Sequence, residues 1–390
     1  MTSLPLEVPP AQPVAMASQD IPRRVIFLGL RGIPNVQGGV EKHVEMLAGE
    51  MAACGWNVEV IGRHRYLPSP PSPANGIRVF SLWAPRKMAL EAIVHTFLGV
   101  CFAAVRRPDI LHIHAVGPAL MVPLARLLGM KVVVTHHGYD YDRQKWGGVA
   151  RRALRLGEYL GMRLSHGRIA VSRQVAQTMS SRYDTPVSFV PNGVAMSRGE
   201  HQTGVLAEFG LQPKRYVLLA ARLVPEKRQT DLIEAFARSG RSDLRLVLAG
   251  GAEFETAYSL QVRAMAQAVP GVVLTGFQSG DKLAELFASA ALFVLPSSHE
   301  GMPIALLEAM ASGLPVLASD IAANRELGLP PEDYFPLGDV GALAAAIMAK
   351  IANPLSEEQA RSQIKQVELA YSWPSVAQKT LEVYRALLAK

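Results

Sequence analysis

The sequence has 390 residues, of which 49% are hydrophobic and 19% are charged, and its formal net charge is +7. This length exceeds what one hydrophobic core usually fills, so we expect two domains, and the composition excludes a disordered chain. The two cysteines, Cys54 and Cys101, are too few for a disulfide framework and favour a reducing, cytoplasmic compartment.

The positive charge is concentrated in the first half of the chain. Residues 1–195 hold 22 Lys and Arg against 12 Asp and Glu, whereas the remainder holds 18 against 21. This asymmetry predicts that the first half meets an anionic ligand or surface. Nucleic acid is not favoured as that partner, because the sequence has no basic run interleaved with aromatic residues and no nucleic-acid-binding motif.

The chain opens with a Pro-rich stretch, residues 1–21, which lacks a basic start and an apolar core of signal-peptide length and is predicted to be a flexible tail. A buried strand is then predicted at 23–30 and a helix at 38–55. Further short apolar runs follow at 57–62, 109–116, 131–138 and 167–172. This alternation of strands and helices predicts a parallel sheet covered on both faces.

Two stretches of the first half suggest a membrane surface. The apolar window 88–105 is interrupted by Glu91 and His95 and barely reaches the roughly 18–20 residues of a membrane span, so we expect a packed or surface-lying helix. The stretch 151–168 is predicted to be a basic helix that carries Arg151, Arg152, Arg155, Arg163 and Arg168. Together they predict contact with an anionic membrane surface.

The pattern starts again after a polar stretch at 196–204, which we predict to be a linker. Strand-like runs recur at 216–222, 244–251, 271–277, 291–298 and 314–320, each followed by a helix-like segment. The predicted fold class is therefore α/β, with two doubly wound, Rossmann-like domains at 22–195 and 205–374 that face each other across a cleft. Such domains bind ligands at the carboxyl ends of their strands.

The first motif at a strand end is RGIPNVQGG, residues 31–39. Gly38 and Gly39 open the next helix and permit close approach of the backbone to a ligand, with a plain strand-to-helix turn as the alternative. The spacing is not G-x-G-x-x-G, so a nicotinamide-dependent oxidoreductase is disfavoured.

A second motif leaves a strand with His136 and His137, one of which could reach a reacting group while the other satisfies a buried turn. Asp140 and Asp142 follow in a D-x-D pattern that can hold a divalent metal. A metal is nevertheless not expected, because a pair of cations elsewhere in the chain makes it redundant.

That cation pair lies in ARLVPEKR, residues 221–228, where Arg222 and Lys227 stand five positions apart in a turn. A guanidinium beside an ammonium suits a diphosphate, and it would stabilise a transition state in which the diphosphate departs. The alternative is a solvated basic loop.

The last motif is HEGMPIALLE, residues 299–308. Glu300 precedes a helix that is predicted to begin at Pro303, and Glu308 lies on its second turn. Carboxylates at the edges of an anion-binding helix start can accept hydrogen bonds from sugar or ribose hydroxyls. A capping pair on an exposed helix is the alternative.

Taken in this order, the motifs resemble the retaining family 4 glycosyltransferases of GT-B fold, from about residue 23 to the C-terminus. E-x7-E, R-x4-K, the early Gly-Gly pair and VPNGV (190–194) all match in place. Residues 375–390 match the family's last helix, which crosses back to the first domain. Ala322 and Ala323 stand where many relatives carry Gly-Gly, which leaves the role of Glu326 open.

The resemblance implies a role for each motif. Arg222 and Lys227 would hold the donor diphosphate, and Glu308 would hold the nucleotide ribose. Glu300 would contact the donor sugar, helped by the backbone of Gly301, Met302 and Pro303. His137 would stand near the sugar, and Gly38 and Gly39 would line the phosphate site. The implied catalytic residues are His137, Arg222, Lys227 and Glu300, with no metal and no other cofactor.

The resemblance further implies that a hexose-type sugar moves, with retention, from a nucleotide diphosphate sugar to a hydroxyl of a glycan or lipid-linked acceptor. The setting would be bacterial exopolysaccharide or cell-surface polysaccharide biosynthesis, in the cytoplasm or peripherally at the inner face of the cell membrane. A sugar-nucleotide epimerase of the same fold and a non-catalytic sugar-nucleotide binder are alternatives. The epimerases of this fold lack the E-x7-E pattern that this sequence carries. A non-catalytic binder is disfavoured because the set of cations and carboxylates is intact. UDP, GDP and dTDP donors all fit the motifs.

Overall fold

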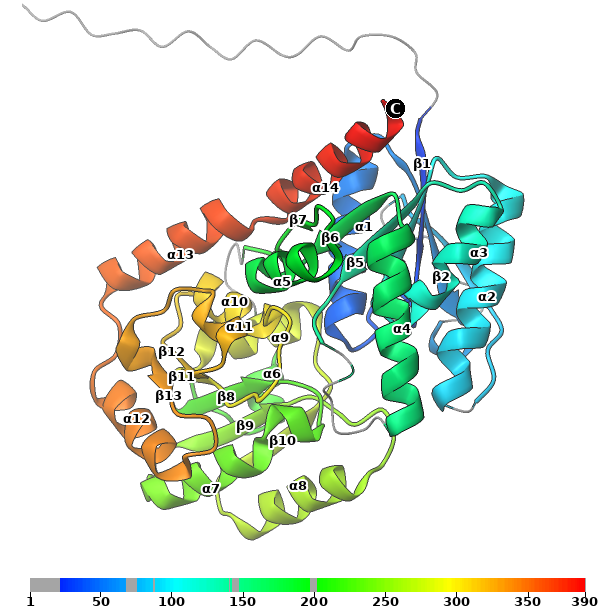
Figure 1. Cartoon of the computed structure of the whole chain (residues 1–390). Coiled ribbons are helices and arrows are strands. Elements are labelled where there is room, and N and C mark those ends of the chain that lie inside the picture. The colour runs from blue at the N-terminus through cyan, green and yellow to red at the C-terminus, as the bar shows by residue number, and fades with distance from the viewer. Residues whose placement is uncertain are drawn as a thin grey trace, which may run out of the picture.

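The computed structural model describes residues 22–67, 76–86, 88–139, 141, 147–196 and 202–389. The predicted tail at 1–21 and residues 197–201 of the predicted linker lie outside the described residues, as do Asp140 and Asp142. The described part of the chain forms two parallel sheets, one in each half (Figure 1).

The first sheet has the strand order β3-β2-β1-β4-β5-β6-β7. Its strands are β1 (Arg24–Leu28), β2 (Asn57–Arg63), β3 (Arg78–Leu82), β4 (Ile110–His114), β5 (Val132–His136), β6 (Gly167–Ala170) and β7 (Ser188–Phe189). The helices between them are α1 (Gly39–Ala53), η1 (His64–Tyr66), α2 (Met88–Arg106), η2 (Pro118–Met121), α3 (Val122–Leu127), α4 (Gly148–Leu164) and α5 (Arg173–Tyr183).

The second sheet has the order β10-β9-β8-β11-β12-β13. Its strands are β8 (Tyr216–Ala220), β9 (Arg245–Ala249), β10 (Val272–Gly276), β11 (Leu292–Leu295), β12 (Val316–Ser319) and β13 (Tyr334–Phe335). Its helices are α6 (Val205–Glu208), η4 (Pro225–Lys227), α7 (Gln229–Ser239), α8 (Ala257–Ala268), α9 (Gly280–Ser289), α10 (Ile304–Ala311), α11 (Ala322–Arg325), η5 (Pro331–Asp333) and α12 (Val340–Ala352). α13 (Glu357–Tyr371) and α14 (Trp373–Leu388) follow.

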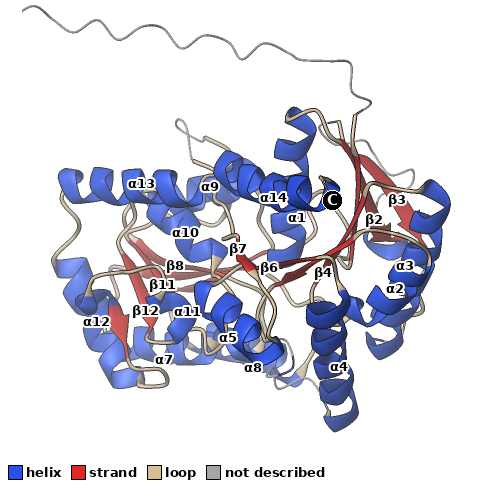
Figure 2. Cartoon of the chain, turned by 45° about the horizontal axis from the view of Figure 1, so that its top comes forward, coloured by secondary structure: helices blue, strands red, loops and turns tan. Residues whose placement is uncertain are grey.

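The predicted α/β fold class is confirmed. Figure 2 shows the strands as a central layer with helices on both sides. In the first sheet β1 lies between β2 and β4, and in the second β8 lies between β9 and β11, so the strand order reverses at β1 and at β8. Ligands of doubly wound sheets bind beyond the carboxyl ends of the strands at such reversals. The loops after β1 and β8 are therefore the first places to look for a site.

Three edge strands were not predicted from the sequence. β3 is only partly buried, and β7 and β13 are two residues long. None of the three therefore presents the continuous buried apolar run by which the central strands are recognised. They extend the sheets without changing the predicted architecture.

The end of the chain packs on the first domain. One core cluster of that domain combines residues of β1, β2 and α1 with five buried side chains of α14: Trp373, Val376, Ala377, Leu381 and Tyr384. Figure 1 shows α13 passing along the second domain and α14 lying beside α1. Residues at the two ends of the described chain thus complete a single core.

The two stretches predicted to meet a membrane form α2 and α4. α2 is a helix as expected, and no helix within the described residues is long and apolar enough to cross a bilayer. The expected extent of the basic helix was wrong, because α4 ends at Leu164 and Arg168 lies on β6. The Arg168 guanidinium donates to backbone carbonyls at the end of α4, including that of Ser165 at 2.8 Å, and so it caps the helix instead of extending its basic face.

Candidate active site

The loop after β1 carries Gly38 and Gly39 to the start of α1. Behind it, the Arg31 guanidinium donates to Glu41 Oε1 at 2.9 Å and to the Gln37 carbonyl at 2.5 Å. A Cβ atom on Gly38 would overlap both the Glu41 carboxylate and Arg31, so only glycine fits there. Burial raises the pKa of Glu41, but the charge and hydrogen bond of Arg31 outweigh it and hold that pKa below its usual value. A buried ion pair therefore fixes the shape of the predicted phosphate loop.

The loop after β8 carries Arg222 and Lys227. The carbonyl of Arg222 accepts a hydrogen bond of 2.7 Å from the buried Gln229 side chain, which ties this loop to the start of α7. Lys227, the last residue of η4, forms an ion pair with Glu300. The Lys227 side chain is 19% exposed and that of Glu300 is 9% exposed, so this pair is mostly shielded from water. The structure thus brings the cation motif and the carboxylate motif into direct contact.

The loop Gly301–Pro303 before α10 meets the first domain. A Cβ atom on Gly301 would overlap the carbonyl of His137, so a side chain at this position is not compatible with the contact between the domains. The side-chain amide of Asn192 donates to the Met302 carbonyl at 2.9 Å. Pro303 stands one residue before the first helical residue, Ile304, and not at the first helical position as predicted. The predicted sugar-binding loop therefore lies against the turn that carries His137.

His137 belongs to a group of imidazoles. Its Nε2 lies 2.9 Å from Nδ1 of His114 on β4, and its ring meets that of His43 on α1 edge-on with centroids 5.0 Å apart. The Nδ1 of His43 is 2.9 Å from Oδ1 of Asn192. Burial lowers the pKa of His43 to about 4, and burial together with neighbouring imidazoles lowers the pKa of His114 well below its usual value. Both rings are therefore neutral at physiological pH.

Ring nitrogens of His43, His114 and His137 all lie within 4.8 Å of one another, and no other group of three His, Cys, Asp or Glu in the described chain comes as close. The 2.9 Å contact between the rings of His114 and His137 has the length of a hydrogen bond. We therefore interpret the group as hydrogen-bonded imidazoles. The other candidate for a metal, Asp140 with Asp142, lies outside the described residues.

Glu308 is on the second turn of α10, as expected. Burial raises the pKa of Glu308 to about 7, and the positive charge of Lys42 on α1 opposes that shift. Lys42 thus acts across the boundary between the domains. Glu326, whose role was open, accepts a hydrogen bond from the backbone N–H of Arg173 at the start of α5.

A further contact between the domains involves Glu253, in the loop after β9. Its carboxylate lies 2.5 Å from Nη1 of Arg31 and accepts a hydrogen bond from the Tyr66 hydroxyl. Arg65 lies over both the Tyr66 ring and the Phe254 ring, with 4.9 and 5.1 Å to the ring centroids. The Arg31 that supports the Gly38–Gly39 loop is therefore also held by the second domain.

Sequence reasoning missed several residues of this site, namely Arg31, Glu41, His43, His114, Asn192 and Glu253. Part of the signal was present in the sequence. His112 and His114 alternate along the end of a predicted strand, His43 lies four residues after Gly39 on the following helix, and Asn192 is part of VPNGV. Glu253 has no such signal, because its partners are 222 and 187 residues away.

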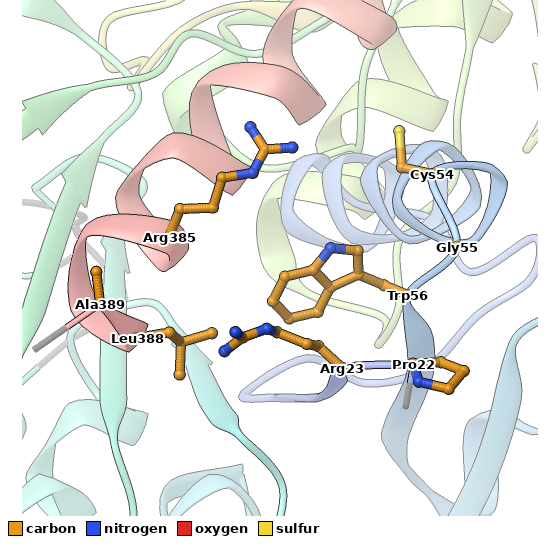
Figure 3. A pocket seen from close by; sticks show the side chains of 8 residues that line it. All are labelled: Pro22, Arg23, Cys54, Gly55, Trp56, Arg385, Leu388 and Ala389. Carbon is orange, nitrogen blue, oxygen red and sulfur yellow. The ribbon is translucent and has the colours of Figure 1, made fainter. Parts of the chain in front are cut away.

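A separate hollow of about 440 Å³ lies at the opposite ends of these elements, between the start of β1, the end of α1 and the end of α14. Figure 3 shows the Trp56 ring and the guanidiniums of Arg23 and Arg385 around it, with Cys54 at its edge. None of the predicted site residues lines this hollow.

Two sequence families match the chain. The family described as "Glycosyl transferase 4-like domain" matches residues 38–193, and the family described as "Glycosyl transferases group 1" matches residues 207–367. An alpha-maltose-1-phosphate synthase from Mycobacterium tuberculosis is 27% identical, over 94% of this chain and 100% of the relative. A GDP-mannose-dependent alpha-mannosyltransferase from Mycolicibacterium smegmatis is 28% identical, over 94% of this chain and 98% of the relative.

Among solved structures, a sucrose-phosphate synthase from Thermosynechococcus elongatus superimposes with a TM-score of 0.80, covering 94% of this chain and 99% of that one, at 21% identity. This similarity shows the fold. The two family matches together span both domains and nearly all of the site described above. The chain therefore belongs to the glycosyltransferases of the family 4 type, which have the GT-B fold and use nucleotide sugars.

Proposed function

We propose that this enzyme transfers a hexose-type sugar, with retention of configuration, to a hydroxyl of a glycan or lipid-linked acceptor in bacterial exopolysaccharide or cell-surface polysaccharide biosynthesis. The observation that carries the proposal is the Lys227–Glu300 ion pair beside the Gly301–Pro303 loop, opposite the turn of His137. Cation, carboxylate and backbone come together there on the second domain, and the turn of His137 on the first domain faces them. This is the set that a diphosphate and a sugar need.

The ion pair suggests how the donor is engaged. An incoming diphosphate competes with Glu300 for the ammonium of Lys227, and Arg222 lies on the same loop. The released Glu300 carboxylate then accepts a hydrogen bond from a sugar hydroxyl. Because the ammonium of Lys227 then contacts the diphosphate, it stabilises the negative charge that develops there as the diphosphate leaves.

Retention follows in this proposal from attack on the face that the diphosphate leaves. The bond between C1 and the diphosphate oxygen breaks as the bond between C1 and the acceptor oxygen forms. The acceptor proton passes to an oxygen of the departing diphosphate. In this scheme no side chain becomes covalently bound to the sugar.

The names of similar proteins support a nucleoside diphosphate sugar as donor without selecting the base. The Mycolicibacterium smegmatis relative is GDP-mannose-dependent, and a solved structure of Anabaena Alr3699/HepE, with a TM-score of 0.73, is in complex with UDP-glucose. The test is a panel of UDP-, GDP- and dTDP-linked hexoses, with nucleoside diphosphate release measured with and without glycan and lipid-linked acceptors. Release that depends on an acceptor supports transfer. Release or epimerisation without an acceptor would instead indicate the epimerase alternative.

We also propose that transfer needs no metal ion, because the cations of Arg222 and Lys227 can balance the diphosphate charge. Excess EDTA is expected to leave the rate of nucleotide release largely unchanged. A loss that Mg²⁺ or Mn²⁺ restores would contradict this and place Asp140 and Asp142 in the site.

Finally, we propose that the first domain works at the inner face of the cell membrane. α2, α3 and α4 lie in one layer beside the first sheet (Figure 1). Their exposed apolar side chains include Leu90, Ile93 and Phe97 on α2, Leu127 on α3, and Val149, Leu156 and Tyr159 on α4. Arg151, Arg152 and Arg155 are exposed beside them. Each basic residue contributes about 1 kcal/mol near an anionic leaflet, and the apolar side chains add burial.

Sedimentation with liposomes tests this surface. Binding is expected to rise with the anionic lipid fraction and to fall at high salt, and the double change Arg151→Gln and Arg152→Gln should weaken it. The matched control is Arg238→Gln with Arg263→Gln, which removes the same charge from exposed positions of the second domain. Liposome binding that does not depend on the anionic lipid fraction, or an equal loss of binding in both double variants, would contradict the membrane proposal.

A further inference from the structure

The contact between His114 and His137 raises the question of which nitrogen carries the shared proton. His114 is fully buried on β4, and its Nδ1 lies 2.9 Å from Nε2 of His137. In a neutral imidazole one nitrogen is a donor and the other an acceptor. Either His114 donates to His137 or His137 donates to His114, and the two arrangements leave different protons on His137.

The surroundings of His114 decide between them. Its second nitrogen, Nε2, is buried and has no hydrogen-bond partner in the described part of the chain. Its ring lies among those of Phe27, His112 and His43, with centroids 5.4, 4.2 and 5.5 Å away. Orphaned buried N–H groups are rarer in proteins than under-satisfied acceptors. The proton of His114 is therefore on Nδ1, and His114 is the donor.

The hydrogen-bond partner of His43 likewise determines which of its ring nitrogens carries the proton. The Met302 carbonyl accepts from Nδ2 of Asn192, which identifies the amide end of that side chain and turns its Oδ1 toward His43. Nδ1 of His43 must then be the donor in their 2.9 Å contact. The loop of the second domain thus sets the protonation of an imidazole that packs edge-on against His137.

We propose that His114 is a positioning residue for sugar transfer, which donates to Nε2 of His137 and holds that ring as the neutral tautomer protonated on Nδ1. The inference rests on the proposed role of His137 beside the donor sugar. In this tautomer His137 gives a hydrogen bond from Nδ1 and cannot remove a proton through Nε2. The acceptor proton then has to leave by another route, in agreement with its transfer to the departing diphosphate.

The tautomer can be observed without any assay of activity. In protein labelled with ¹⁵N-histidine, NMR distinguishes protonated from bare ring nitrogens, and the spectrum of His137→Asn identifies the signals of His137. We expect a protonated Nδ1 and a bare Nε2 on His137. A protonated Nε2 would overturn the proposal, whether or not a donor sugar has been found.

Two nearly isosteric substitutions separate hydrogen bonding from packing. His114→Asn places an amide donor near the position of Nδ1, whereas His114→Leu fills similar space with no donor. We expect His114→Leu to lower kcat by about tenfold or more and His114→Asn to recover most of it. Wild-type kcat in His114→Leu, or an equal loss in both variants, would overturn the donor role. Thermal melting shows whether each variant is folded, and if His114→Leu is not, the spectrum and His114→Asn still decide.

Discussion

Lys227 and Glu300 are oppositely charged side chains that form an ion pair, and under the proposed function they would separate when a donor binds. This arrangement lets the cation stay partly buried without an unpaired charge, since an isolated buried charge is costly. The sequence placed both residues at strand ends but did not show that they touch.

Lys227→Ala and Glu300→Ala are each expected to leave a folded protein that transfers little sugar. Losing a charge-assisted contact to the developing diphosphate or to the sugar costs on the order of 2–4 kcal/mol of barrier, or about 10²–10³ in rate. The measurement is the initial rate of nucleoside diphosphate release. Lys282→Ala is the control, because Lys282 forms an exposed ion pair with Glu208 within the second domain. Near wild-type turnover in either site variant would contradict the assignment.

Glu308 gives a prediction about pH. The pKa of its carboxyl is raised from 4.5 to about 7 by burial, so between these values the folded protein binds a proton that the unfolded chain has released. The free energy of unfolding of the wild type should therefore fall as pH rises from about 4.5 to 7. Glu308→Gln lacks this contribution. Its free energy of unfolding, relative to that of the wild type, should therefore be higher at pH 8 than at pH 4.5 by on the order of 1–3 kcal/mol.

Urea unfolding of both proteins at the two pH values measures that difference. Glu357→Gln is the control, since the Glu357 side chain is 87% exposed. A difference between Glu308→Gln and the wild type that does not change with pH would show that the pKa of Glu308 is not raised in the folded protein.

At this scale the sequence predicted residues whose chemistry depends on local position. Lys227, Glu300 and Glu308 follow from strand ends and a helix start, which are visible in the order of residues. The partners of these groups were not predictable in the same way. His43 meets Asn192 only because the first domain brings α1 beside the loop after β7, and Arg31 meets Glu253 only because the two domains are placed together. Nothing near these residues in the sequence encodes either placement.

Among the elements, the central strands were predictable because short runs of Val, Ile and Leu between turn residues are typical of buried strands. α4 was predicted too long for a related reason. The apolar and basic spacing continues past Leu164, but the chain turns at Ser165, and Arg168 folds back to bond the freed carbonyls. Side-chain capping of that kind depends on the tertiary structure, and the spacing of apolar residues along a helix does not reveal it.

The junction of VPNGV with α14 gives a prediction at the same scale. A Cβ atom on Gly193 would lie 2.9 Å from Cε2 of Trp373 and closer still to two other ring atoms. Trp373 is buried in the core that α14 shares with α1, so the ring has little room to move. Gly193→Ala is therefore expected to destabilise the protein by about 1–3 kcal/mol.

Gly49→Ala is the matched control for that change. Gly49 lies within α1, and no atom lies within 4 Å of a Cβ built on it, so alanine should stabilise the helix by about 0.5–1 kcal/mol. Urea unfolding measures both variants. A Gly193→Ala protein as stable as the wild type would mean that the Trp373 ring yields.

For the molecule as a whole, Glu253 is one of the side chains that join the two domains near the Gly38–Gly39 loop. It bonds both Arg31 and Tyr66. Glu253→Gln should weaken the contact between the domains by about 1.5–3 kcal/mol. The two domains are then expected to move apart in the absence of donor, and KM for the donor should rise about tenfold. Small-angle X-ray scattering reports the opening as a larger radius of gyration.

Glu255→Gln is the control for the effect of charge alone. Glu255 pairs with Arg263 in its own domain, at 3.1 Å, and its side chain is 60% exposed. An unchanged radius for Glu253→Gln, or the same change in both variants, would show that the contact does not hold the domains closed.

The place of α14 has a consequence for biosynthesis. α1 and the strands that it covers emerge from the ribosome first, but Trp373, Leu381 and Tyr384, which complete their core, are translated only after the entire second domain. A nascent chain that has not yet reached Trp373 therefore exposes an apolar groove beside α1, the type of surface that makes incomplete chains prone to aggregation. The first domain is therefore synthesised first but completes its core last, when α14 is added. This groove is a surface to which a chaperone can bind on the nascent chain.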